Sequence, residues 1–157
     1  MDNRAGITTI LDTLARIKKP PKQDIYVAFT TTEEIGGMGI SFFTSNTQID
    51  TLIAIDVGPV ASEYQTKLSE DPIIVYKDSF AQYDKGIADR LRSTKIQTQA
   101  AIFERYGSDA SIAASKGLVA KAALVAIPTE NTHGFEIIHK NAIAHASRLL
   151  AEFLRRL

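Results

Sequence analysis

Short apolar segments of strand length alternate along this chain with segments of helical periodicity, and this alternation constrains the fold more than any other feature. The clearest strand is residues 52–55, a continuous apolar run that ends at Asp56, which is typical of a strand buried on both faces. Further strands are predicted at 25–30, 73–76, 97–103 and 122–127. Helices are predicted at 5–17, 40–44, 84–92, 110–115 and 142–154. This order predicts an α/β sandwich with a largely parallel sheet.

The first predicted helix carries large apolar residues at helical spacing, namely Ile7, Ile10, Leu11, Leu14 and Ile17. This spacing is typical of an amphipathic helix. Asp2 and Asn3 precede it, and either can serve as its N-cap. Near the other end of the chain, residues 128–136 are predicted as a loop that contains His133.

Composition excludes several classes of protein. The 157 residues include 18 Lys and Arg and 18 Asp and Glu, so the formal net charge is zero, whereas a nucleic-acid-binding protein needs a basic excess. Because there is no cysteine, a metal site must use carboxylates and the three histidines, His133, His139 and His145. No apolar run is long enough to span a bilayer, and the polar first residues do not resemble a signal peptide. We therefore expect no nucleic-acid or membrane partner and a cytoplasmic location.

Acidic residues follow two of the predicted strands. Residues 25–30 lead into Glu33 and Glu34, and residues 52–55 lead into Asp56. Ligands of α/β proteins bind beyond the carboxyl ends of the strands, where His133 and Asp2 can join these acids. Carboxylate and imidazole ligands suit zinc, cobalt or manganese. One glutamate of the pair can bind the metal while the other acts as a general base.

Each of these residues also has a structural interpretation. Asp2 can be only an N-cap, Asp56 only a turn residue, and the Glu33–Glu34 pair part of a solvated loop. A single histidine in a loop, such as His133, is usually a surface residue. The spacing alone leaves both interpretations open.

Five motifs follow one another along the chain: Asp2-Asn3-Arg4-Ala5-Gly6, Thr31-Thr32-Glu33-Glu34-Ile35-Gly36-Gly37-Met38-Gly39, Ala54-Ile55-Asp56-Val57, Gly107-Ser108-Asp109 and Thr132-His133-Gly134-Phe135-Glu136. In this order the series resembles the M42 family of metallo-aminopeptidases, the glutamyl and deblocking aminopeptidases. The resemblance covers essentially the whole chain. It implies a three-layer αβα sandwich of the zinc-exopeptidase type.

The resemblance implies a site for two divalent metal ions, zinc or cobalt, bridged by Asp2. Glu34 and His133 would complete one metal site, and Asp56 would belong to the other. Glu33 would be the general base that activates the attacking water.

The resemblance also implies a substrate class. The family acts on the N-termini of peptides, so peptides are the expected partners. Gly107, Ser108 and Asp109 would line the substrate site.

Two departures from the family pattern affect these expectations. Asn3 stands where aspartate is common, at a position that is not itself the bridging ligand. Family members also carry, ahead of this motif, a segment with a His-x-Asp ligand pair and an inserted domain for oligomer assembly, which residues 1–157 do not include.

We therefore expect residues 1–157 to be the C-terminal part of a peptidase catalytic domain, with an incomplete sheet, one metal ion or none, and reduced or no activity alone. An incomplete sheet exposes apolar surface, which favours a homo-oligomer.

Two other functions stay open at this point. One is a catalytically inactive subunit that binds a peptide or a partner protein. The other is a related two-metal deacylase or carboxypeptidase, because the Glu33–Glu34 pair is common to the wider zinc-exopeptidase group. The Asp-Asn-Arg-Ala-Gly motif favours the aminopeptidases over that group.

Overall fold

A five-stranded sheet with the order β1-β4-β2-β3 forms the centre of the computed structural model, which describes residues 1–19 and 21–157. The strands are β1 (Thr51–Pro59), β2 (Ile73–Lys77), β3 (Gln99–Ile102), β4 (Lys121–Glu130) and β5 (Ile137–Ile138), which pairs with β4. β1 and β4 are parallel, as are β2 and β3, but β2 is antiparallel to β4. The sheet is therefore mixed rather than largely parallel. The reason is the connection from β1 to β2, which holds a short 3₁₀ helix and no crossover helix.

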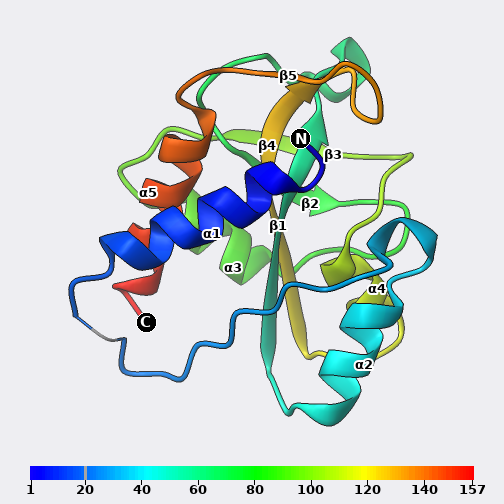
Figure 1. The fold of residues 1–157 in the computed structure, drawn as a ribbon, viewed down its shortest axis with the longest axis vertical. Helices are drawn as coiled ribbons and strands as arrows, with labels where there is room; N and C mark the ends of the chain where they lie inside the picture. The colour runs from blue at the N-terminus through cyan, green and yellow to red at the C-terminus, as the bar shows by residue number, and fades with distance from the viewer. Residues whose placement is uncertain (20) are drawn as a thin grey trace.

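Helices cover both faces of the sheet, and this confirms the predicted three-layer α/β architecture. The helices are α1 (Arg4–Arg16), α2 (Met38–Asn46), α3 (Lys85–Arg92), α4 (Asp109–Ser115) and α5 (Ala142–Leu154). Figure 1 shows α1, α3 and α5 on one side of the sheet and α2 and α4 on the other. The two core layers meet at β4, where the fully buried neighbours Leu124 and Val125 pack into opposite layers. No described helix has the length and apolar character needed to cross a lipid bilayer.

Helix α1 starts as predicted but packs through an unexpected face. The side chain of Asn3 caps it by accepting a hydrogen bond from the Gly6 N–H at 2.8 Å. Its buried residues are small or polar, whereas three of the five apolar side chains that define its amphipathic spacing are exposed: Ile7 by 42 %, Leu11 by 54 % and Leu14 by 43 %.

Close approach to the sheet explains this orientation. A Cβ atom added to Gly6 would lie 2.6 Å from the carbonyl oxygen of Ile55, so only glycine lets α1 sit this near β1. Further along, Ser147 of α5 donates a hydrogen bond to the Thr9 carbonyl at 3.2 Å. Small and hydroxyl side chains therefore form the interface of α1 with α5, and the large ones point away.

The strand predicted at 25–30 is wrong. This segment is extended, but it has no ladder partner among the described residues, and four of its side chains are exposed: Ile25, Tyr26, Val27 and Phe29. The Tyr26 ring meets the Phe43 ring of α2 edge-on, with the ring centroids 6.5 Å apart. Apolar and β-branched residues favour extended backbone, but a strand also needs a neighbour to pair with.

The predicted loop at 128–136 is shorter than expected. β4 continues to Glu130, and β5 pairs back onto it through Thr129–Ile138 and Glu130–Ile137. His133 therefore lies on a short hairpin connection rather than in a long loop. The other predicted elements are present with small shifts of their bounds.

Candidate metal centre

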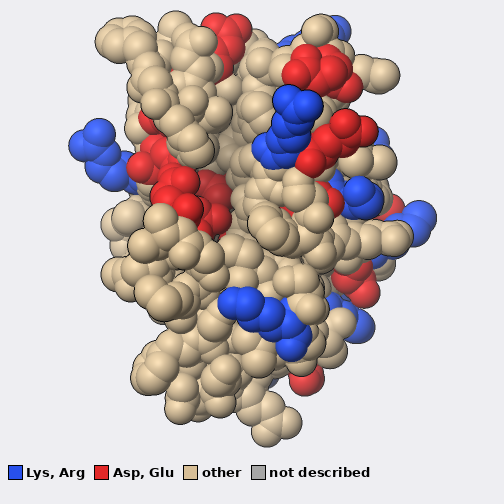
Figure 2. Space-filling model, turned by 90° about the vertical axis from the view of Figure 1, so that its right-hand side faces the viewer, with Lys and Arg blue, Asp and Glu red and all other residues tan. Residues whose placement is uncertain are grey.

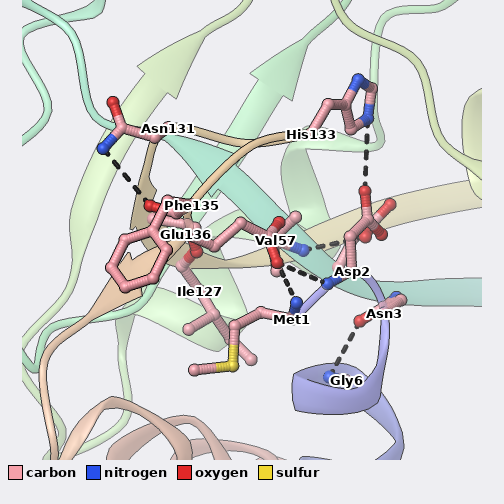
Figure 3. Close-up of polar contacts among 12 residues, drawn as sticks. Met1, Asp2, Asn3, Gly6, Val57, Ile127, Asn131, His133, Phe135 and Glu136 are labelled. Atoms are coloured by element: carbon pink, nitrogen blue, oxygen red, sulfur yellow. Dashed lines mark hydrogen bonds and ion pairs between the residues drawn. The ribbon is translucent and has the colours of Figure 1, made fainter.

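Three of the predicted metal ligands lie together near the carboxyl end of β4. The Nε2 atom of His133 lies 3.3 Å from Asp2 Oδ2 and 3.4 Å from Glu34 Oε2. Each of the three residues offers one ligand atom, and these atoms lie within 4.8 Å of one another. Figure 3 shows the His133 imidazole pointing at the Asp2 carboxylate.

These separations fit a divalent cation. Two donors that are each about 2.1 Å from a tetrahedral zinc ion lie about 3.4 Å apart. The side chains of His133 and Glu34 are 68 % and 58 % exposed, so a cation can reach them from solvent, while the Asp2 side chain is only 19 % exposed. The donor set of two carboxylates and one imidazole leaves a fourth position open, as catalytic zinc sites do.

Asp2 is fixed by its neighbour Asn3. The Asn3 amide nitrogen donates a hydrogen bond to the Ile55 carbonyl of β1 at 2.7 Å, while the Asn3 side-chain oxygen caps α1. One side chain thus ties the start of α1 to the sheet. This holds Asp2 near Asp56, which follows Ile55 directly.

Glu33 and Glu34 lie in a 3₁₀ helix (Glu33–Ile35) bounded by left-handed backbone. Thr32 before it has φ 61°, and Gly36 and Gly37 after it have φ 110° and 63°. A β-branched residue with positive φ is strained, and such residues cluster at functional sites. His133, with φ 63°, shares this feature.

Glu33 is half-buried beside the three ligands. Burial, and after it the nearby carboxylates of Asp109, Glu34 and Asp2, raise its pKa from 4.5 to about 7, and His133 opposes this shift. Burial and Asp2 also raise the pKa of Glu34. Figure 2 views the molecule from the side of α2 and α4 and shows several acidic side chains gathered in one cluster. Such a concentration of carboxylates favours cations.

Asp56 is close to this group but does not join it. Asp56 is 8 % exposed, and its Oδ1 accepts a hydrogen bond from the Val57 N–H at 2.8 Å. Burial, and then the charge of Asp2, raise its pKa well above the ordinary value. The described residues thus bring together three of the four predicted metal ligands, with Asp56 behind them.

The predicted substrate stretch lies at the start of α4. Ser108 is fully buried and caps α4, and its hydroxyl lies 2.8 Å from the Tyr83 hydroxyl. Gly107 faces the ring of Phe80. Asp109 accepts a hydrogen bond from the Thr30 hydroxyl through Oδ2, while its Oδ1 is buried without a partner among the described residues. Of this stretch, Asp109 is the residue whose charge reaches Glu33.

Glu136 is a residue to which the sequence analysis assigns no role. Its side chain is 7 % exposed, and its Oε2 accepts a hydrogen bond from the Asp2 N–H at 3.1 Å and contacts the Met1 nitrogen (Figure 3). The sequence signal was present, because Glu136 closes the same short motif that contains His133. Its contact with Asp2 spans 134 positions along the chain and cannot be read from local spacing.

Comparisons with known proteins identify the family of this chain. The sequence model of the M42 glutamyl aminopeptidase family matches residues 1–149. A curated protein of Acetivibrio thermocellus with a provisional aminopeptidase name is 28 % identical over an alignment of 163 positions, gaps included. The alignment covers 97 % of this chain and 49 % of that protein. The chain therefore spans about half the length of the curated relatives that it matches.

Solved structures give the same result. An aminopeptidase from the archaeon Desulfurococcus kamchatkensis is 28 % identical and superposes with a TM-score of 0.90, over 99 % of this chain and 47 % of its own. The TET1 peptidase of Pyrococcus horikoshii, which can assemble into a tetrahedron or a large octahedral shell, has a TM-score of 0.88 at 24 % identity, over 99 % of this chain and 48 % of its own. By sequence match and by fold, this chain belongs to the M42 glutamyl aminopeptidase family.

Proposed function

We infer that this chain carries the C-terminal catalytic part of a metallo-aminopeptidase that removes N-terminal residues from peptides. The observation that supports this most is the convergence of Asp2, Glu34 and His133, whose ligand atoms lie within 4.8 Å of one another. The half-buried carboxyl of Glu33 lies beside them. Membership of a family that uses divalent metals supplies the reaction class.

Each residue would have a distinct part in the hydrolysis. Asp2, Glu34 and His133 would hold one divalent ion, zinc or cobalt, and Asp56 would serve a second ion that Asp2 bridges. When bound, such ions polarise the scissile carbonyl and stabilise the oxyanion.

Glu33 and Asp109 would act on the substrate side of the site. Glu33 would accept a proton from the water that attacks the carbonyl and pass it to the departing amine. Asp109 has a buried oxygen without a partner in the described part of the chain, which suits contact with the charged amino group of a peptide. Gly107 and Ser108 would shape this side of the site.

One ion is the expected occupancy of the isolated chain. The site of Asp2, Glu34 and His133 has three donors, whereas Asp56 would share only Asp2 and water with a second ion. We therefore expect this chain alone to bind one zinc or cobalt ion and to hydrolyse leucyl- or glutamyl-anilides slowly or not at all.

Titration calorimetry with Zn²⁺ and Co²⁺, combined with anilide turnover, tests this proposal. The part of the Acetivibrio thermocellus relative that this chain does not span is then added in trans, and hydrolysis should rise. A chain that binds no divalent ion refutes the metal centre. Two tightly bound ions with rapid turnover refute the one-ion expectation.

The exposed apolar surface of α1 and residues 25–29 favours a second candidate function, a subunit that binds a partner protein without catalysis. The TET1 peptidase of Pyrococcus horikoshii can assemble into a tetrahedron or a large octahedral shell, and a homo-oligomer of this chain is one form of that function. This candidate predicts that hydrolysis stays absent after the missing part is supplied, although the two parts associate.

A further inference from the structure

We propose that Glu136 is a positioning residue that sets the spacing between Asp2 and His133 in the metal centre, an inference that rests on the proposed function. Glu136 is not one of the family-derived ligands, and its carboxylate does not belong to the three-residue group. It acts through the backbone of Asp2.

The contacts of Glu136 connect two segments that are far apart in the sequence. Its Oε2 accepts a hydrogen bond from the Asp2 N–H at 3.1 Å and also contacts the nitrogen of Met1. The backbone of Glu136 directly precedes β5, where Ile137 pairs with Glu130 of β4. The carboxylate therefore ties the turn that carries Asp2 to the edge of the ladder.

His133 lies on the same hairpin as Glu136, three positions earlier. The His133 Nε2 and Asp2 Oδ2 atoms lie 3.3 Å apart. Because Glu136 lies on the hairpin of His133 and accepts a hydrogen bond from the backbone of Asp2, its carboxylate constrains the positions of both residues. The His133 backbone has a left-handed φ of 63°, which needs support from its surroundings. Glu136 anchors the end of the same hairpin through its hydrogen bond with the Asp2 N–H.

The burial of Glu136 indicates a role beyond closing the hairpin. Its side chain is 7 % exposed, and Oε1 is buried without a hydrogen-bond partner among residues 1–19 and 21–157. Burying a carboxylate costs free energy unless hydrogen bonds compensate for it, whereas an apolar side chain at this position would carry no such cost. Buried polar side chains of this kind often hydrogen-bond to a residue that binds a metal and so orient it. Loss of such a side chain lowers metal affinity about 10- to 100-fold.

Cobalt binding by the full chain tests this role without any need for turnover. The variants are Glu136→Ala, which removes the acceptor, and Glu136→Gln, which keeps an oxygen for the Asp2 N–H. Glu130→Ala is the matched control, because Glu130 lies on the same hairpin and, among the described residues, forms no hydrogen bond or ion pair with Asp2. Calorimetry measures the affinity for Co²⁺, visible absorption reports its coordination geometry, and circular dichroism checks the fold.

We expect Glu136→Ala to bind Co²⁺ about 10- to 100-fold more weakly and with altered absorption bands. Glu136→Gln and Glu130→Ala should stay within a few-fold of the unmodified chain. Unchanged binding by Glu136→Ala overturns the role of Glu136 while leaving the metal centre intact. Equal losses in Glu136→Gln and Glu136→Ala also overturn it, since charge rather than the hydrogen bond would then matter. If the unmodified chain binds no Co²⁺, the proposed function fails and the role of Glu136 fails with it.

Discussion

The Glu33 carboxyl links the chemistry of the site to the stability of the fold. Its pKa is about 7, chiefly because of burial, against an ordinary value of 4.5. Between these two values the folded chain holds a proton that the unfolded chain has lost. The contribution of Glu33 to stability is therefore fully present below about pH 4.5 and is lost as the pH rises through about 7.

A stability series across pH tests this ionisation. In chelator-treated protein at pH 8, Glu33→Gln should raise the free energy of unfolding by roughly 1–2 kcal/mol, less than the shift alone implies because the side chain is half in water. At pH 4 the variant and the unmodified chain should be equally stable. Urea denaturation measures both values, with the exposed Glu63→Gln as control. A difference that does not change between pH 4 and pH 8 would contradict the assignment.

A second substitution series separates the base from the ligands. In a domain completed in trans, Glu33→Gln should lower anilide turnover by about 10²- to 10⁴-fold and leave the metal content unchanged, because it removes a proton acceptor and not a ligand. Glu34→Gln and His133→Ala should lower the metal content itself. Metal analysis of the same samples used for turnover distinguishes the two classes. Near-normal turnover by Glu33→Gln would show that the roles are wrongly assigned.

At the scale of elements, the turn that carries Glu33 depends on Gly37. Its φ is 63°, and an added Cβ would lie 2.7 Å from Cδ1 of Ile112 on α4. Gly117 is a natural comparison, because its φ of 68° is similar but an added Cβ would meet nothing within 4 Å. Comparing substitutions at Gly37 and Gly117 therefore distinguishes the cost of left-handed backbone from the cost of overpacking.

We expect Gly117→Ala to lower the free energy of unfolding by about 1–2 kcal/mol, the cost of placing an L-residue in left-handed backbone. Gly37→Ala should cost about 1–3 kcal/mol more, because α4 or the turn must also shift. Urea denaturation of both variants measures the difference. Equal losses would mean that Ile112 gives way freely and that the turn is not held against α4.

The elements also show where sequence patterns succeed and where they fail. The strand at residues 52–55 and the cap of α1 by Asn3 are local features, and the sequence predicts both. The burial predicted for this strand is wrong, because β1 lies at the edge of the sheet and residues 52–55 are only half-buried. Whether 25–30 becomes a strand depends on a neighbour, and no local pattern supplies that information.

The burial of α1 shows the same limit. The spacing of its apolar residues predicts an amphipathic helix but not which face meets the protein. Gly6 and Thr9 decide the matter, because small side chains allow close packing, and the larger Leu11 is left outside.

The candidate site divides in a similar way. Motif order identified Asp2, Glu34 and His133, which the structure brings together, and Asp56, which lies behind them. The contact of Glu136 with Asp2 joins the two ends of the chain, so it required the fold.

At the scale of the whole molecule, the exposed face of α1 and residues 25–29 form apolar surface that water contacts unfavourably. Leu11, 54 % exposed, is the most exposed of the large apolar side chains on α1. Surfaces of this kind mark places where protein meets protein.

Self-association should therefore depend on Leu11. Leu11→Lys should shift the chain toward monomer in light scattering coupled to size exclusion. Thr8→Lys is the control, because it adds the same charge to an exposed position of α1 without removing an apolar side chain. A monomeric unmodified chain, or equal effects of the two substitutions, would exclude this face as the contact.

The position of Asp2 has a practical consequence for handling the protein. Met1 contacts Glu136 beside the candidate ligands. Figure 1 shows the C-terminus just beyond the end of α5, far from the N-terminus. An affinity tag of histidines fused ahead of Met1 would place foreign imidazoles within reach of the centre, where they would compete for the ion and distort any affinity measured. Purification handles therefore belong after Leu157.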